Sequence, residues 1–169
     1  MTGYLLTKSF FSTKLMQKTF FTLCMLLAAY SIQAQSFKAA EVDAVDKQFD
    51  EGLLRQDLKM TFMNVADNAI FYGTDPNDKW TATTFRKMLE KNIAERRPTP
   101  ITVSRTITPV AAGTMAIVTK QVNWSIFKTP LREVAVYEKK KGWQLKYFSL
   151  NILFPDERIH ELNQIATRK

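Results

Sequence analysis

The hydrophobic pattern of this chain changes its period near Pro98 and Pro100, and that change determines the fold class. Before the two prolines, apolar residues recur at the three- and four-residue spacing of amphipathic helices. After them, apolar and polar residues alternate, as in strands that bury one face. Helices followed by strands with short turns are typical of an α+β domain with an antiparallel meander. The sequence therefore predicts an α+β fold.

Individual elements follow from the same pattern. Helices are expected over 37–54, 57–66 and from residue 81 or 83 to 95, and a short strand over 69–72. Further strands are expected over 101–111, 114–127, 131–140 and 142–153, with a weakly amphipathic helix after Pro155. Gly113, Pro130 and Gly142 supply the turns between these strands.

The N-terminal segment has the pattern of a secretory signal peptide over about residues 16–34. Lys18 gives it a positive start, residues 20–29 form an apolar run, and Ala34 is a small residue at the expected cleavage point. The run is too short for a permanent membrane span. The alternative, a buried hydrophobic helix, does not explain why charge, apolar run and small residue follow in this order. We therefore expect an exported protein, periplasmic or extracellular, with no stable membrane anchor after cleavage.

This leader divides the chain into residues 1–34 and a single domain at 35–169, and Met16 is a better expected start of translation than Met1. Of the 24 Lys and Arg residues, three lie in the leader, which holds none of the 16 Asp and Glu. The domain thus keeps 21 basic residues, mostly scattered, and we expect no nucleic-acid partner. The only cysteine, Cys24, lies in the leader, so the domain has no disulfide and no thiol nucleophile.

Two segments of the domain resemble a known family. Residues 71–81, Phe-Tyr-Gly-Thr-Asp-Pro-Asn-Asp-Lys-Trp-Thr, resemble the strand-loop-helix motif of SnoaL-like proteins in the nuclear transport factor 2-like superfamily, although Ala82 replaces the usual glycine. Residues 142–147 resemble the start of the family's final long strand. The resemblance implies a cone-shaped, cystatin-like roll, in which a curved antiparallel sheet wraps round N-terminal helices and opens over a pocket. Family members include isomerases, cyclases, dehydratases and proteins without known chemistry.

The resemblance also implies which side chains face the pocket. In the family, the face of the final strand that begins at Trp143 points into the cone, so Tyr147, Ser149 and Asn151 are expected to bind a ligand, together with Tyr72 and Trp80 from the loop motif. Relatives often carry histidine at the positions of Tyr147 and Ser149. Since neither residue here titrates near neutral pH, we expect no histidine-based acid–base catalysis.

A carboxylate provides the enzymatic alternative. Asp67 could act as a base at the junction of the second helix and the first strand, with Tyr72 or Tyr147 as hydrogen-bond donor, or it could simply end the helix in a turn. Asp75 and Asp78 begin like a calcium loop, but Lys79 stands where the next oxygen ligand is needed, so no metal is expected. His160 is expected to be exposed, and no cofactor is expected because the domain has no glycine-rich phosphate loop.

Three functions remain open from the sequence. The first is a binding protein for a small, partly apolar molecule. The second is an isomerase, cyclase or dehydratase with a carboxylate base and a tyrosine donor. The third is a non-catalytic domain that forms a homodimer through its sheet. The sequence favours the first, because the expected pocket residues are polar but do not titrate near neutral pH.

Overall fold

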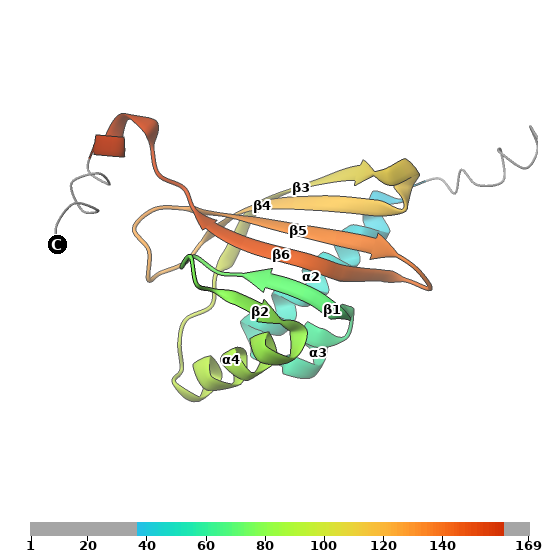
Figure 1. Cartoon of the computed structure of the whole chain (residues 1–169), viewed down its shortest axis with the longest axis horizontal. Coiled ribbons are helices and arrows are strands. Elements are labelled where there is room, and N and C mark those ends of the chain that lie inside the picture. The colour runs from blue at the N-terminus through green and yellow to red at the C-terminus, as the bar shows by residue number, and fades with distance from the viewer. Residues whose placement is uncertain (1–36, 161–169) are drawn as a thin grey trace, which may run out of the picture. The chain divides into compact units, whose positions relative to one another are not determined.

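The computed structural model describes residues 37–160 (Figure 1). Its helices and strands follow in the order α2 (Ala39–Arg55), α3 (Leu58–Phe62), β1 (Val65–Tyr72), β2 (Lys79–Thr81), α4 (Ala82–Ala94), β3 (Ile101–Val110), β4 (Met115–Asn123), β5 (Leu131–Lys139) and β6 (Trp143–Ile152). Short 3-10 turns occupy Ala111–Gly113 (η1) and Asp156–Arg158 (η2). The predicted leader, and the part of the C-terminal helix beyond residue 160, lie outside the described residues.

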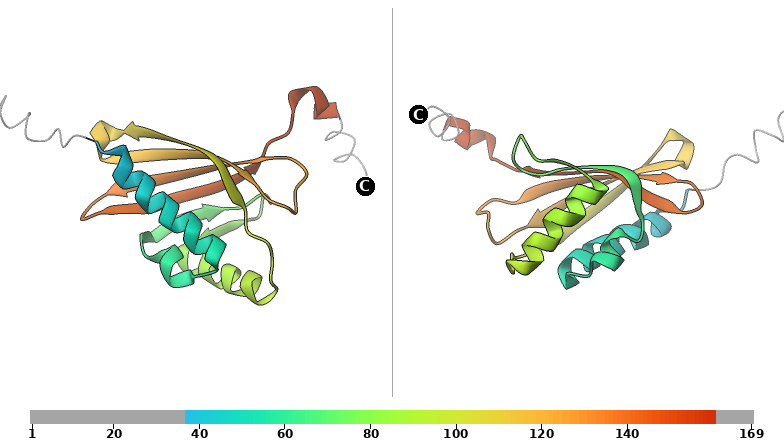
Figure 2. Two further views of the ribbon diagram at one scale, coloured as in Figure 1. Left: turned by 180° about the vertical axis from the view of Figure 1, so that it is seen from behind. Right: turned by 60° about the horizontal axis from the view of Figure 1, so that its bottom comes forward.

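The six strands form one curved sheet in the order β2-β1-β6-β5-β4-β3. From β3 to β6 each strand is antiparallel to the next, as the meander predicts, whereas β1 runs parallel to β6. The helix α2 crosses the concave face of the sheet, and α4 lies against β1 and β2 (Figure 2). No described helix covers the opposite face, which we call the outer face (Figure 2). The predicted α+β class, with a curved sheet around helices, is confirmed.

The core lies between α2, α4 and the concave face. Val42 and Phe49 of α2 are buried two turns apart on one side of the helix. Phe71 of β1 stacks on Phe85 of α4 at 4.0 Å between ring centroids, and Phe148 of β6 packs against both rings. The fully buried aromatic and aliphatic side chains thus join the helices to the middle of the sheet.

Local signals explain where the helices begin. The side chain of Asp57 accepts a hydrogen bond of 3.0 Å from the Met60 N–H, as expected for the cap of α3. Thr81 and Thr84 form a reciprocal capping box at the start of α4. None of the helices among residues 37–160 is both long and apolar enough to cross a membrane.

Three predicted boundaries are wrong, and one short strand was not predicted. The second helix ends at Phe62 and the first strand begins at Val65, because this stretch pairs with the remote strand β6. The strand β2, which pairs with the end of β1, was not predicted, since three residues are too few to show alternation. β4 stops at Asn123, where a turn begins that the Phe127 N–H closes on the Trp124 carbonyl at 2.9 Å.

Candidate functional site

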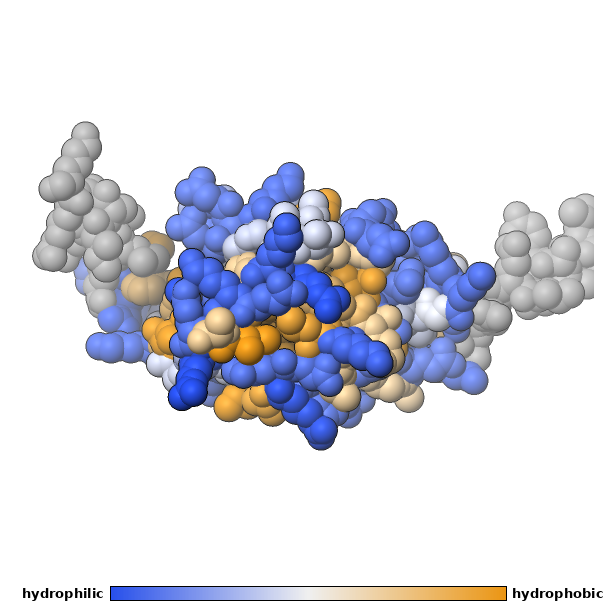
Figure 3. All heavy atoms as spheres, turned by 90° about the horizontal axis from the view of Figure 1, so that it is seen from below, coloured by the Kyte–Doolittle hydropathy of each residue, from blue (hydrophilic) through white to orange (hydrophobic). Residues whose placement is uncertain are grey.

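A cavity of about 360 Å³ opens between the helices and one end of the sheet. From the side on which α3 and α4 lie, apolar side chains are visible between hydrophilic ones (Figure 3). The cavity wall comes from the ends of α2 and α3, from α4, from the loops after β1, α4 and β4, and from β6. Its volume is within the range of small-molecule sites in proteins. Its lining includes Trp80, Phe85, Asn92, Arg97, Trp124 and Phe148.

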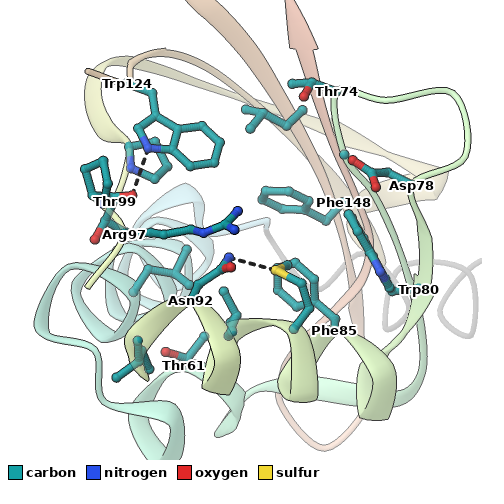
Figure 4. Close-up of a pocket in the computed structure, with 18 of the residues that line it drawn as sticks. Thr61, Thr74, Asp78, Trp80, Phe85, Asn92, Arg97, Thr99, Trp124 and Phe148 are labelled. Atoms are coloured by element: carbon teal, nitrogen blue, oxygen red, sulfur yellow. Dashed lines mark hydrogen bonds between the residues drawn. The ribbon is translucent and has the colours of Figure 1, made fainter. Parts of the chain in front are cut away.

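Aromatic rings form much of the wall. Figure 4 shows Phe85 and Phe148 at the inner side of the cavity, Trp80 at one flank and Trp124 at the other. The Trp124 indole N–H donates to the Pro98 carbonyl at 2.8 Å, so its polar atom is satisfied by the protein. The rings can therefore offer their faces to a planar or aliphatic ligand.

The polar groups of the wall are few. Thr61 uses its hydroxyl to donate to the Asp57 carbonyl at 2.8 Å. The Asn92 side-chain N–H donates to the Met88 sulfur at 2.9 Å, and among the described residues no group donates to its carbonyl oxygen. Arg97 extends its guanidinium into the cavity toward Phe148 (Figure 4). These groups would orient a ligand that the rings hold.

Two of the predicted ligand-binding residues, Tyr72 and Trp80, lie in the cavity wall. Their contributions differ, however. Trp80 packs its ring 5.9 Å from that of Phe85, inside the molecule. The Tyr72 ring instead contacts the ring of Tyr147 at 5.6 Å and lies under Lys79. Trp80 is therefore better placed than Tyr72 to contact a ligand in the cavity.

The structure does not place Tyr147, Ser149 or Asn151 among the residues that line this cavity. The register between β5 and β6 shifts so that Lys146 has no partner, which is a β-bulge. One extra residue exchanges the two faces of a strand, so Trp143 faces the core before the bulge and Phe148 faces the cavity after it. Simple alternation from Trp143 leads to the wrong face beyond residue 146.

Asp67 also lies away from the cavity. The pairing of β1 with β6 is irregular between Val65 and Ile70, and both Asp67 and Asn68 are exposed there. Asp67 is not among the lining residues, and its place in the middle of β1 also excludes the helix-ending turn. The structure therefore does not bring this carboxylate to a bound ligand.

Side-chain to backbone hydrogen bonds order the loop that contains Asp75 and Asp78. The Asp75 carboxylate accepts from the Asn77 N–H at 2.8 Å, and the Asp78 carboxylate accepts from the Asp75 N–H at 3.3 Å. Such side-chain to backbone bonds are typical of Asx turns. His160 is exposed, as expected.

Sequence reasoning missed a buried ionic cluster on the concave face. Lys120 of β4 is 1% exposed, and its ammonium contacts Glu133 of β5 together with Asp46 and Asp50 of α2, at 3.3 Å and 2.5 Å for the two aspartates. Arg105 of β3 bonds the same two aspartates at 2.6 Å and 2.5 Å. This cluster ties α2 to three strands.

Burial and charge shift the pKa values in this cluster in different directions. Burial raises the pKa of the Glu133 carboxyl to about 7, more than the nearby Lys120 lowers it. Burial lowers the pKa of Lys120, but the carboxylates around it, Glu133 first, more than reverse this, so the pKa lies above its usual value. Burial and the negative Asp46, to which Tyr137 donates at 2.8 Å, raise the pKa of Tyr137.

The cluster contains carboxylates spaced for a metal ion. One oxygen each of Asp46, Asp50 and Glu133 lies within 4.8 Å of the other two. The Lys120 ammonium, however, contacts all three and supplies the positive charge that they need. The sequence signal was present, because Lys120 and Glu133 are charged residues at inward positions of otherwise apolar strands.

Comparison with known proteins identifies the fold. No family model matches the sequence, and no curated protein matches it. Solved structures do match: an NTF2-like protein of unknown function from Pseudomonas putida KT2440 has 15% identity and a TM-score of 0.55, over 70% of this chain and 90% of its own. A cystatin-like fold protein from Burkholderia xenovorans LB400 has 15% identity and a TM-score of 0.57, over 72% and 96%. A candidate ketosteroid isomerase from Shewanella frigidimarina NCIMB 400 has 18% identity and a TM-score of 0.54, over 70% and 97%.

At these identities the similarity establishes the fold. The chain has the NTF2-like, cystatin-like fold, which is the fold that its resemblance to SnoaL-like proteins predicts. Proteins of this fold carry unrelated functions, so the function must be argued from the site.

Proposed function

We propose that this protein is an exported SnoaL-like domain that binds a small, partly apolar molecule in the cavity between α4 and β6. The observation that carries the proposal is the cavity itself, about 360 Å³ in volume and walled by aromatic and aliphatic side chains with few polar groups. Such a wall favours a ligand with an apolar body, because binding removes both surfaces from water.

The chemistry of the wall favours binding over catalysis. Among the described lining residues, only Asp78 and Arg97 carry a charge, and none is a histidine. Asp78 accepts a backbone hydrogen bond within its own loop, and Asp67 is exposed elsewhere. An isomerase-type reaction needs a carboxylate or imidazole base within hydrogen-bond reach of the substrate. The binding proposal requires no such group.

Titration with N-phenyl-1-naphthylamine, a neutral dye that fluoresces in apolar surroundings, tests this proposal. We expect saturable binding to the domain, excited at a wavelength that tryptophan does not absorb. Ile93→Trp places a large ring in the cavity wall and should weaken binding at least tenfold. Ile70→Trp, on the outer face, is the matched control and should leave the affinity unchanged.

Two results would count against this proposal. One is the absence of saturable dye binding to the folded wild-type domain. The other is an equal loss of affinity in Ile93→Trp and Ile70→Trp, which would show that the dye binds the surface.

The export part of the proposal depends on the leader alone. We expect the protein in the periplasmic or extracellular fraction to begin close to Gln35. Its intact mass, measured after cell fractionation, tests this directly. A protein found only in the cytoplasm, with its first 34 residues still attached, would contradict export and leave the cavity proposal untouched.

A further inference from the structure

One charged side chain of the cavity wall, that of Arg97, has donor groups without an acceptor among the described residues. Asp78 and Arg97 are the two charged residues among the described lining residues, and the Asp78 carboxylate holds its own loop. The Arg97 Nε–H donates to Glu95 at 2.7 Å. Among residues 37–160, no group accepts from the two terminal Nη groups of Arg97, which point into the cavity (Figure 4).

The backbone at the end of α4 positions this arginine. The Arg96 N–H bonds the Ile93 carbonyl and the Arg97 N–H bonds the Asn92 carbonyl, both at 2.9 Å, which is the Schellman pattern of a helix end. Arg96 has φ of 54°, in the left-handed region that favours glycine. A non-glycine residue in this region is held there by its surroundings. This turn places the Arg97 side chain in the cavity wall, beside Asn92 (Figure 4).

The pair with Glu95 leaves Arg97 able to bind a second anion. Both side chains are largely exposed, at 57% for Arg97 and 40% for Glu95, and an exposed ion pair of this kind contributes little free energy. Glu95 contacts the Nε edge and leaves the Nη edge, whose two N–H groups match the two oxygens of a carboxylate or sulfonate.

We propose that the ligand of this cavity is an amphipathic organic anion, whose carboxylate or similar head group binds the Arg97 Nη groups and whose apolar body lies among Trp80, Phe85 and Phe148. The inference rests on the proposed binding function and adds the ligand class. The carbonyl oxygen of Asn92, beside Arg97 in Figure 4, would accept a hydrogen bond from a hydroxyl or amide on the ligand.

A pair of dyes tests the charge directly. N-Phenyl-1-naphthylamine and 8-anilinonaphthalene-1-sulfonate share the same aromatic body, and only the second carries an anionic group. We expect the wild-type domain to bind the sulfonate at least fivefold more tightly than the neutral dye. Added sodium chloride should weaken sulfonate binding and leave the neutral dye unaffected.

Substitutions then assign the preference to Arg97. Arg97→Gln should remove the preference for the sulfonate while the affinity for the neutral dye stays within twofold of wild type. Arg97→Lys should keep part of the preference. Lys87→Gln removes one positive charge from an exposed residue of α4 that does not line the cavity, and should keep the full preference. Melting temperatures show whether each variant is folded, and the salt dependence of the wild type tests the inference without any variant.

The outcomes separate the two proposals. If the neutral dye binds in the cavity but the sulfonate shows no preference, no salt dependence or an equal loss in Lys87→Gln, the anionic head group is wrong and the binding function stands. If neither dye binds the folded wild-type domain, both proposals fail.

Discussion

Lys120 carries a buried positive charge at the centre of the ionic cluster. Its ammonium is removed from water and contacts three carboxylates, and a buried charge of this kind is tolerated only when it is fully compensated. Four carboxylates contact Lys120 or Arg105, namely those of Asp43, Asp46, Asp50 and Glu133, and Asp43 also pairs with Lys47. These four acids exceed the three cations by one negative charge. A single proton on Glu133 would balance them, in agreement with the raised pKa of Glu133.

This balance predicts a pH dependence of stability. The pKa of Glu133 is about 7 in the folded protein and 4.5 for a free glutamate, so between these values the folded state binds more protons than the unfolded state. Its contribution to stability is full below pH 4.5 and is lost as the pH rises through 7. Glu133→Gln cannot ionise and should lack this loss.

Urea unfolding at pH 5 and pH 8 measures the effect. The free energy of unfolding of the wild type, relative to Glu133→Gln, should fall by on the order of 1 kcal/mol or more between these two values. If the difference in free energy of unfolding between the wild type and Glu133→Gln is the same at pH 5 and pH 8, Glu133 is ionised in the folded protein at both values.

At the scale of elements, the sequence predicted most helices and strands but missed one long-range pairing and one bulge. The starts of the helices near residues 57 and 81 and the long strands follow from residue types and spacing within a few positions. The parallel pairing of β1 with β6 joins residues far apart in the chain, such as Ile70 and Tyr147. The bulge at Lys146 lies within the β5–β6 hairpin, between the pairs Val136–Tyr147 and Tyr137–Leu145. No local pattern marks the bulge, since a bulge residue needs no special side chain.

The bulge has a measurable consequence, because it places Leu150 on the cavity side and the adjacent Asn151 on the outer face. The domain has no cysteine of its own, so single-cysteine variants give a clean measurement. Asn151→Cys should react rapidly with a thiol reagent, with or without N-phenyl-1-naphthylamine. Leu150→Cys should react more slowly, and the dye should slow it further.

The opposite pattern, with Asn151→Cys protected by the dye and Leu150→Cys unaffected, would restore the face assignment that alternation from Trp143 predicts. It would also return Ser149 and Asn151 to the ligand site.

At the scale of the whole molecule, the uncovered outer face is the place to test a homodimer. Ile70, Tyr147, Val136 and Ile117 are register partners on four adjacent strands and form an apolar row across that face. Ile70 and Tyr147 are 38% and 37% exposed. The homodimer, the third of the functions left open by the sequence, stays a prediction, and this row would form its centre.

Sedimentation equilibrium of the domain measures the assembly. We expect a dimer, and Val136→Lys should shift it to the monomer, because the row would then carry an unpaired charge into the interface. Val103→Lys is a matched control on β3, at a residue that is already 56% exposed and outside the row. A wild-type monomer at high concentration would contradict the homodimer.

The most direct test of ligand binding in the cavity uses the protein's three tryptophans. Trp80 and Trp124 line the cavity, whereas Trp143 is buried against Phe37 and Glu41 and does not line it. In ¹⁵N–¹H spectra of the domain titrated with N-phenyl-1-naphthylamine, the indole signals of Trp80 and Trp124 should shift until saturation and that of Trp143 should stay in place. A shift of Trp143 alone, or no shift at Trp80 and Trp124 while the dye binds, would contradict ligand binding in this cavity.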